Sequence, residues 1–100
     1  MLEIEEIKDG NSITLKLKGK LNSTTADDFK EKAIALSEEY SDMKVDFEDL
    51  LYVSSAGLRV ILELHKKMKK DNKSFVLINV DEGAMDIIKA TGLSRFLIIK

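Results

Sequence analysis

Hydrophobic and charged residues alternate in two short segments at the start of the chain. Apolar side chains alternate with glutamates over residues 2–6 and with Thr and Lys over residues 13–18. A period of two is typical of strands that bury one face. Asp9-Gly10-Asn11, between the two segments, is typical of a tight hairpin turn. The pattern therefore predicts an antiparallel hairpin at the N-terminus.

Three later segments carry apolar residues at three- and four-residue steps, which predicts three amphipathic helices. The first spans residues 25–40 and the second spans residues 56–70, where apolar positions cover more than half of the circumference. The third runs from an Asp81 cap to Thr91 and stops at Gly92. Three hydroxyl residues precede the first helix as candidate N-caps: Ser23, Thr24 and Thr25.

The remaining apolar segments are short and read as strands. We expect strands over residues 43–47, 74–79 and 96–99, with residues 50–53 as an apolar connection. The segment at 74–79 is almost continuously apolar, which is typical of a central strand buried on both faces. Because a hairpin is followed by alternating helices and strands, the order predicts an α/β fold. We expect one domain over residues 1–100, with a mixed sheet, later strands parallel and helices packed on it.

Composition narrows the functional classes. Hydrophobic residues make up 44% of the chain and charged residues 34%, which fits a globular domain. The absence of cysteine excludes disulfides and thiolate metal sites. Sixteen basic against 18 acidic residues give a net charge of −2, a poor match for nucleic acid. No apolar run approaches the roughly 20 residues of a membrane span, and the acidic start is unlike a signal peptide. We expect a cytoplasmic protein without a cofactor.

Two adjacent hydroxyls, Ser54 and Ser55, lie where an apolar segment meets the second predicted helix. A serine at a helix start is commonly an N-cap. It can also be a phosphorylation site, because the first amides of a helix stabilise an anion. From the residues alone the capping role is the commoner one, and both interpretations stay open. Ala56 and Gly57 keep the neighbouring surface small enough for another protein to approach the hydroxyl.

The same residues belong to a longer pattern. Val45-Asp46-Phe47 and the segment from Tyr52 to Ile61 resemble the signature of STAS domains, in particular the bacterial anti-sigma factor antagonists. Gly19-Lys20-Leu21-Asn22, then Thr25-Ala26, and later Thr91-Gly92-Leu93 also match. The resemblance spans nearly the whole chain in the right order, and its Ser-Ser-Ala-Gly-Leu block is fairly specific. It shifts the balance towards a phosphorylation site.

The resemblance implies a non-enzymatic partner switch. In that family the unmodified antagonist binds an anti-sigma factor that is also a serine kinase of the GHKL ATPase type, and a sigma factor is released. The kinase phosphorylates a serine at this helix start, and a PP2C-type phosphatase reverses it. Aligned on Gly57, the phosphoacceptor is Ser55, with Ser54 as second choice. The implied partner-binding residues are Asn22, Ser23, Thr24, Ser54, Ser55, Ala56, Gly57 and Leu58.

Three departures from the family pattern matter. Ser54 and Asn22 stand where members often have aspartate, and many members carry a further helix beyond the last strand, whereas this sequence stops at Lys100. We expect the missing helix to leave an apolar face for a partner or a dimer. The substitution at Ser54 leaves an alternative open: a STAS signalling or scaffold module that binds a nucleotide, another small ligand or a non-sigma partner.

The third functional class is an enzyme with a serine nucleophile, and the sequence lacks the residues that such an enzyme needs. There is no Gly-x-Ser-x-Gly motif, and the single histidine, His65, lies about three helical turns from Ser55. We expect His65 to be a packing residue. The resemblance implies a structural or loop-anchoring role for Asp46.

Overall fold

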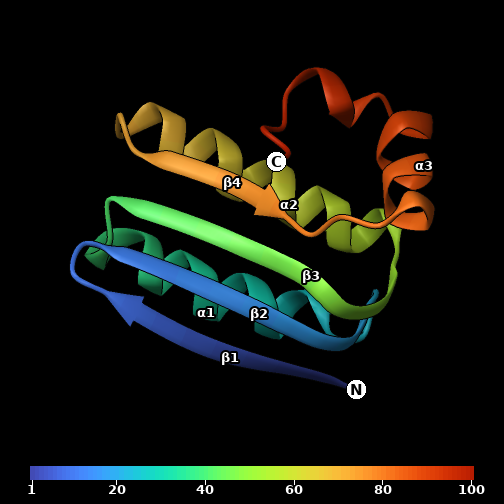
Figure 1. The fold of residues 1–100 in the computed structure, drawn as a ribbon, viewed down its shortest axis with the longest axis horizontal. Coiled ribbons are helices and arrows are strands. Elements are labelled where there is room, and N and C mark those ends of the chain that lie inside the picture. The colour runs from blue at the N-terminus through green and yellow to red at the C-terminus, as the bar shows by residue number, and fades with distance from the viewer.

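A mixed sheet of four strands forms the centre of the computed structural model, which describes residues 1–100 (Figure 1). In spatial order the strands are β1 (Leu2–Asp9), β2 (Ser12–Leu21), β3 (Asp42–Val53) and β4 (Ser74–Ile78). β1 pairs antiparallel with β2, and the β2–β3 and β3–β4 pairs are parallel. The predicted hairpin and the α/β fold class are confirmed.

Three helices accompany the sheet. α1 (Ala26–Glu39) and α2 (Ser55–Lys70) lie together behind it, and α3 (Glu82–Ala90) stands at the end of the molecule where β3 and β4 finish (Figure 1). A short 3-10 helix, η1 (Leu93–Arg95), follows α3. The alternate residues of β2 that were predicted to face inward are buried in the same apolar core as Phe29 of α1 and Leu64 of α2. The core therefore lies between one sheet face and these two helices.

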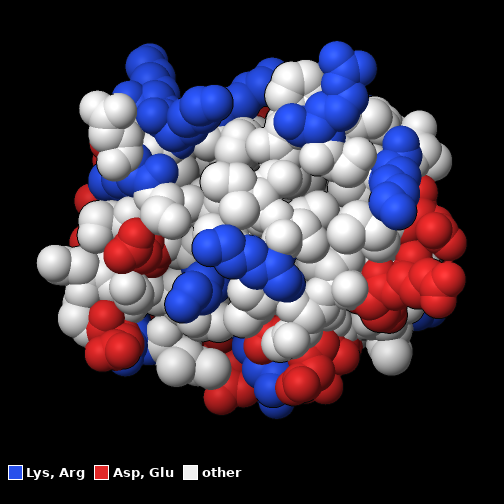
Figure 2. Space-filling model, turned by 45° about the horizontal axis from the view of Figure 1, so that its top comes forward, with Lys and Arg blue, Asp and Glu red and all other residues white.

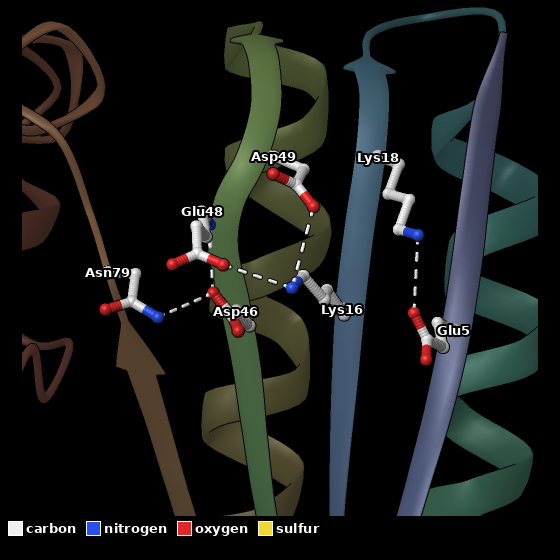
Figure 3. Close-up of polar contacts among 7 residues, drawn as sticks. All are labelled: Glu5, Lys16, Lys18, Asp46, Glu48, Asp49 and Asn79. Carbon is white, nitrogen blue, oxygen red and sulfur yellow. Dashed lines mark hydrogen bonds and ion pairs between the residues drawn. The ribbon is translucent and has the colours of Figure 1, made fainter.

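The opposite face of the sheet carries charged side chains in pairs (Figure 3). Lys16 Nζ lies 3.1 Å from Glu48 and 3.6 Å from Asp49, and Lys18 Nζ lies 3.4 Å from Glu5. The hydrogen bond to Glu48 and the charges of both carboxylates raise the pKa of Lys16. Because these pairs are in contact with water, they contribute little to stability.

β3 is longer than the sequence predicts, since it continues to Val53 through the residues expected to form a connection. Its pairing with β2 shifts register twice, between Lys16 and Lys18 and between Gly19 and Lys20. Such bulges break the alternation of buried and exposed positions. Here they leave residues 51 and 52 exposed between buried neighbours. Residues 50–53 therefore lack the alternating pattern by which a strand is predicted from sequence.

Asp46 anchors the first of these irregularities. Its Oδ1 accepts hydrogen bonds from the backbone N–H of Glu48 and from Nδ2 of Asn79, both at 2.9 Å (Figure 3). The carboxylate is buried, and a buried carboxylate without donors would be strongly destabilising. The loop-anchoring role expected for Asp46 therefore has a structural basis: it fixes β3 to the segment after β4.

Two expectations about the C-terminal half are wrong. β4 is buried on both faces, but it is the outer strand of the four-stranded sheet and not a central one. Residues 96–99 form no strand, because only Ile99 bridges to Leu77. Phe96 still has helical backbone angles (φ −107°, ψ −38°) after η1. The chain therefore becomes extended only after Phe96, and too few residues remain beside β4 to form a strand. Phe96 and Ile98 remain 55% and 48% exposed.

His65 is a packing residue, as expected. It is 8% exposed, and its ring meets Phe75 edge-on with 6.3 Å between centroids. Burial, and secondarily the charge of Lys69, lowers the pKa of His65 from its usual 6.5. The folded protein therefore keeps this imidazole neutral at a pH where the unfolded chain already takes up a proton.

We expect this difference to make the domain less stable in acid. Above about pH 6.5 neither state is protonated at His65, and its contribution is fully present. As the pH falls below that value the unfolded state binds the proton first, so the free energy of unfolding decreases. Urea unfolding of the wild type and of His65→Gln at pH 7.5 and pH 5.0 measures the effect. The wild type should lose more stability than the variant; equal losses would contradict the prediction.

Candidate functional site

Two predicted partner-binding segments meet at one edge of the sheet. The last residues of β2 and β3, Leu21 and Val53, are register partners in neighbouring parallel strands. The backbone N–H of Ser54 then donates to the carbonyl oxygen of Leu21 at 2.9 Å. The loop that begins at Asn22 and the start of α2 therefore lie side by side, as the family resemblance implied for Asn22 and Ser54, which are 32 positions apart.

The loop between β2 and α1 is held by its own side chains. Asn22 Oδ1 accepts from the backbone N–H of Thr24 at 3.0 Å and from its hydroxyl at 2.7 Å. The Thr25 hydroxyl donates to the carbonyl oxygen of Lys20 at 2.9 Å. Thr25 is the N-cap residue of α1, but its hydroxyl bonds to the preceding loop and not to the helix. The side chains of the three candidate residues therefore do not cap α1. Ser23 and Thr24 are exposed on this fixed loop.

The two serines of the junction have different environments. Ser54 is the N-cap of α2, with extended backbone (φ −95°, ψ 172°), and its Oγ accepts from the Gly57 N–H at 3.2 Å. Ser55 is the first residue of the helix, is exposed, and its hydroxyl makes no hydrogen bond. The Ser54 hydroxyl therefore caps the helix, and the Ser55 hydroxyl is free in solvent.

We expect this difference to be visible in stability. Ser54→Ala removes the cap and should lower the free energy of unfolding by about 1 kcal/mol. Ser55→Ala removes a hydroxyl without a partner and should change it by less than about 0.5 kcal/mol. Urea denaturation of both variants provides the measurement. Equal losses in the two variants would contradict the assignment of Ser54 as the cap.

Of the three helices, only α2 begins without an acidic side chain in its first turn. α1 has Asp27 and Asp28 in its first turn and α3 has Glu82, whereas α2 has no acidic residue there. The backbone amides of Ser55 and Ala56 have no hydrogen-bond acceptor. Arg59 follows one turn later, exposed and without an ion pair. An anion added at Ser55 would meet unsatisfied donors and a positive helix end.

Gly57 and Leu58, predicted as partner-binding residues, point inward. Leu58 is fully buried, and a Cβ on Gly57 would lie 2.6 Å from Leu21 Cγ and 3.0 Å from the Leu21 carbonyl oxygen. The glycine is needed because β2 and α2 approach too closely here for a side chain. These two residues therefore support the junction from below, while Ser55 and part of Ala56 form its surface.

A groove beside the serines was not predicted. It has a volume of about 200 Å³ and lies between the end of β3 and α3, where it is lined by Leu50, Leu51, Tyr52, Val53, Asp81, Gly83, Ala84 and Ile87. Leu51 is 78% exposed and Tyr52 49% exposed, although both are apolar. The signal in the sequence was the pair of apolar residues next to the serines, but the bulges that expose them are not visible there.

The histidine of this chain is not placed to activate either serine. His65 is buried and makes no hydrogen bond to either serine. No three His, Asp or Glu side chains lie close enough together to hold a metal ion. None of the helices has the length and apolar character that crossing a membrane requires. The arrangement instead presents an exposed hydroxyl, a fixed loop and an apolar groove on one continuous edge.

Comparisons with known proteins bear on the family and the fold of this chain. Residues 4–99 match the family model described as "Mlab, STAS domain". The anti-sigma-B factor antagonist of Bacillus subtilis (strain 168) is 26% identical over 96 residues, which cover 96% of this chain and 88% of that protein.

Two solved structures have the same fold. An anti-sigma factor antagonist from Mycobacterium paratuberculosis superposes with a TM-score of 0.88 at 15% identity, covering 99% of this chain and 85% of the other. The Bacillus cell fate determinant SpoIIAA in its phosphorylated form gives a TM-score of 0.77 at 15% identity, covering 100% and 91%.

Proposed function

Because this chain belongs to the STAS domain family, we propose that it is an anti-sigma factor antagonist whose binding is switched off by phosphorylation of Ser55. Unphosphorylated, it binds an anti-sigma factor and a sigma factor is released. The observation that carries the proposal is the free, exposed hydroxyl of Ser55 on the edge shared by the Asn22–Thr24 loop and the β3–α3 groove. The curated relative in Bacillus subtilis is itself an anti-sigma-B factor antagonist.

Ser55 is a better phosphoacceptor than Ser54. A kinase must reach the hydroxyl and use its oxygen as a nucleophile. The Ser54 oxygen is half-buried and bonded to the Gly57 amide, so modifying it would break the helix cap. The Ser55 oxygen has no such bond. That a protein of the same fold, SpoIIAA, has a phosphorylated form also supports a modification site in this chain.

A phosphate on Ser55 suits the folded domain. It adds a charge of about −1.5 to −2 and three strong acceptor oxygens beside the unsatisfied amides of Ser55 and Ala56. Arg59, four residues along the helix, is on the same face, and helical side chains lean towards the N-terminus. The helix end and the guanidinium therefore stabilise the phosphate, and the domain stays folded.

In the complex with a partner, the same phosphate is unfavourable. The surface around Ser55 is partly apolar because of Leu51 and Tyr52, so a docked protein would exclude water from the phosphate. Burying that charge, or placing it opposite an acidic side chain, costs several kcal/mol. The same modification is thus tolerated by the free protein and disfavours the complex.

The expected kinase is the anti-sigma factor itself, of the GHKL serine-kinase type, with a PP2C-type phosphatase restoring the bare serine. Incubating the protein with such a kinase and ATP, followed by mass spectrometry, locates the phosphate. Modification at Ser55 that is lost in Ser55→Ala supports the proposal. Binding without any modification would instead favour a STAS module with another mode of regulation, and no binding to any anti-sigma factor would contradict the antagonist role.

A further inference from the structure

A second groove lies at the other end of α2, against the C-terminal segment. Two adjoining hollows of about 260 and 210 Å³ share His65, Lys69 and Phe96 in their linings. The rise along α2 places Lys69 about 20 Å from Ser55, so this groove is separate from the proposed anti-sigma surface. Phe96 and Ile98, from the segment that forms no strand, make its outer wall.

The floor and outer wall are apolar. Leu62 and Phe96 line one hollow, and Phe75, Phe96 and Ile98 line the other. Phe96 and Ile98 keep about half of their surface exposed, although each is large enough to gain from burial. An alkyl chain in the groove would cover this surface without displacing any part of the fold.

The rim is cationic and lacks counterions. Lys66, Lys69 and Lys70 line the groove and form no ion pair, and no acidic side chain lines either hollow. By contrast Lys67, on the neighbouring face of α2, pairs with Glu38 at 2.6 Å and with Asp71 at 3.5 Å. Figure 2 shows an uncharged area with Lys and Arg side chains along the top and at the centre of the view, and acidic side chains at its left, bottom and right. The groove is therefore positively charged and apolar at once.

His65 adds a polar atom without a partner. The residue is more than nine-tenths buried, and its Nδ1 is sealed with no hydrogen bond. Nε2 also makes no hydrogen bond but is not sealed, and the ring lines both hollows. Because a buried nitrogen without an acceptor is less costly when it carries no proton, the tautomer with hydrogen on Nε2 is favoured. That N–H is then a donor available in the groove.

We propose that this groove binds a small single-chain amphiphilic anion, with its head group at Lys69 and His65 and its alkyl chain over Phe96. The concave shape and the orphaned imidazole favour a single molecule over the flat surface of a membrane. A carboxylate and a phosphate head group share the required chemistry, which is a compact anion that accepts hydrogen bonds.

The test uses His65 as a probe, since it is the only histidine in the chain. Its ring signals in an NMR spectrum report on the groove without ambiguity. Octanoate and octyl phosphate should each shift them saturably, and the tighter of the two identifies the head group. Octanol, which lacks the charge, and acetate, which lacks the chain, should shift them far less. Equal shifts with octanol and octanoate would overturn the proposal.

Variants at the rim and the wall provide the second measurement. Lys69→Gln and Phe96→Ala should each weaken octanoate binding about fivefold, because each removes one half of the recognition. Lys44→Gln, an exposed lysine on the far side of the sheet without an ion pair, should leave it unchanged. Unchanged affinity in both groove variants would overturn the proposal. So would binding to phosphatidylglycerol vesicles alone, which would identify a membrane surface. Neither result bears on Ser55, so the anti-sigma role is tested independently.

Discussion

Phosphorylation of Ser55 is expected to lower the affinity for the anti-sigma factor about a thousandfold, which corresponds to roughly 4 kcal/mol. The reason is the desolvation of a charge of about −2 in an interface that includes Leu51 and Tyr52. Ser55→Asp, with one negative charge and no tetrahedral oxygens, should lose about a hundredfold. Isothermal titration calorimetry against the anti-sigma factor measures both losses.

The matched controls separate charge from folding. Ser55→Ala should bind like the unmodified protein and should resist the kinase. Ser55→Asp should melt within a few degrees of the wild type, because an acidic residue in the first turn of α2 is favourable and that turn has none. A phosphorylated protein that binds as tightly as the bare one would refute the switch. A Ser55→Asp variant that unfolds would refute the account of the open helix start.

Gly57→Ala is expected to lower the free energy of unfolding by about 2 kcal/mol. The added methyl group would lie 2.6 Å from Leu21 Cγ and 3.0 Å from the Leu21 carbonyl oxygen. Part of the neighbourhood is backbone, so the strand end must shift with the side chain. The loss outweighs the gain in helix propensity of about 1 kcal/mol that alanine normally has over glycine. Urea denaturation measures the net change.

Gly83 provides the control, since it also lies in the first turn of a helix. A Cβ there would meet nothing closer than Asp81 Oδ1 at 3.6 Å. Gly83→Ala should therefore stabilise the domain by up to about 1 kcal/mol. The two substitutions are chemically identical and should differ in sign. If Gly57→Ala were also stabilising, the close approach of β2 and α2 would not be a real constraint.

Much of the fold follows from local pattern. The hairpin, the three helices and the parallel later strands were predictable because burial on one face imposes a period of two or 3.6. The junction at Ser54 and Ser55 was visible because a helix start has a characteristic composition. These features depend on residues near one another in the chain, and so the sequence displays them directly.

The remaining features depend on contacts between distant segments. The first bulge of β3 is held by the contact between Asp46 and Asn79, which are 33 positions apart. The second bulge lies where β3 pairs with the end of β2, and there Leu51 and Tyr52 face solvent. The different environments of the two serines depend on the hydrogen bond from the Ser54 N–H to the carbonyl oxygen of Leu21, at the end of a distant strand. An apolar run such as residues 96–99 is equally compatible with a strand and with an extended tail. Pattern alone could not decide any of these.

The buried carboxylate of Asp46 has a consequence for recognition. By bonding both to the first bulge of β3 and to Asn79, it connects the two segments that lead into the walls of the groove beside Ser55. We therefore expect this surface to change little when a partner binds, so that little conformational entropy is lost on association. Under the proposed function, we then expect phosphorylation of Ser55 to act mainly on the lifetime of the complex and little on the shape of this surface.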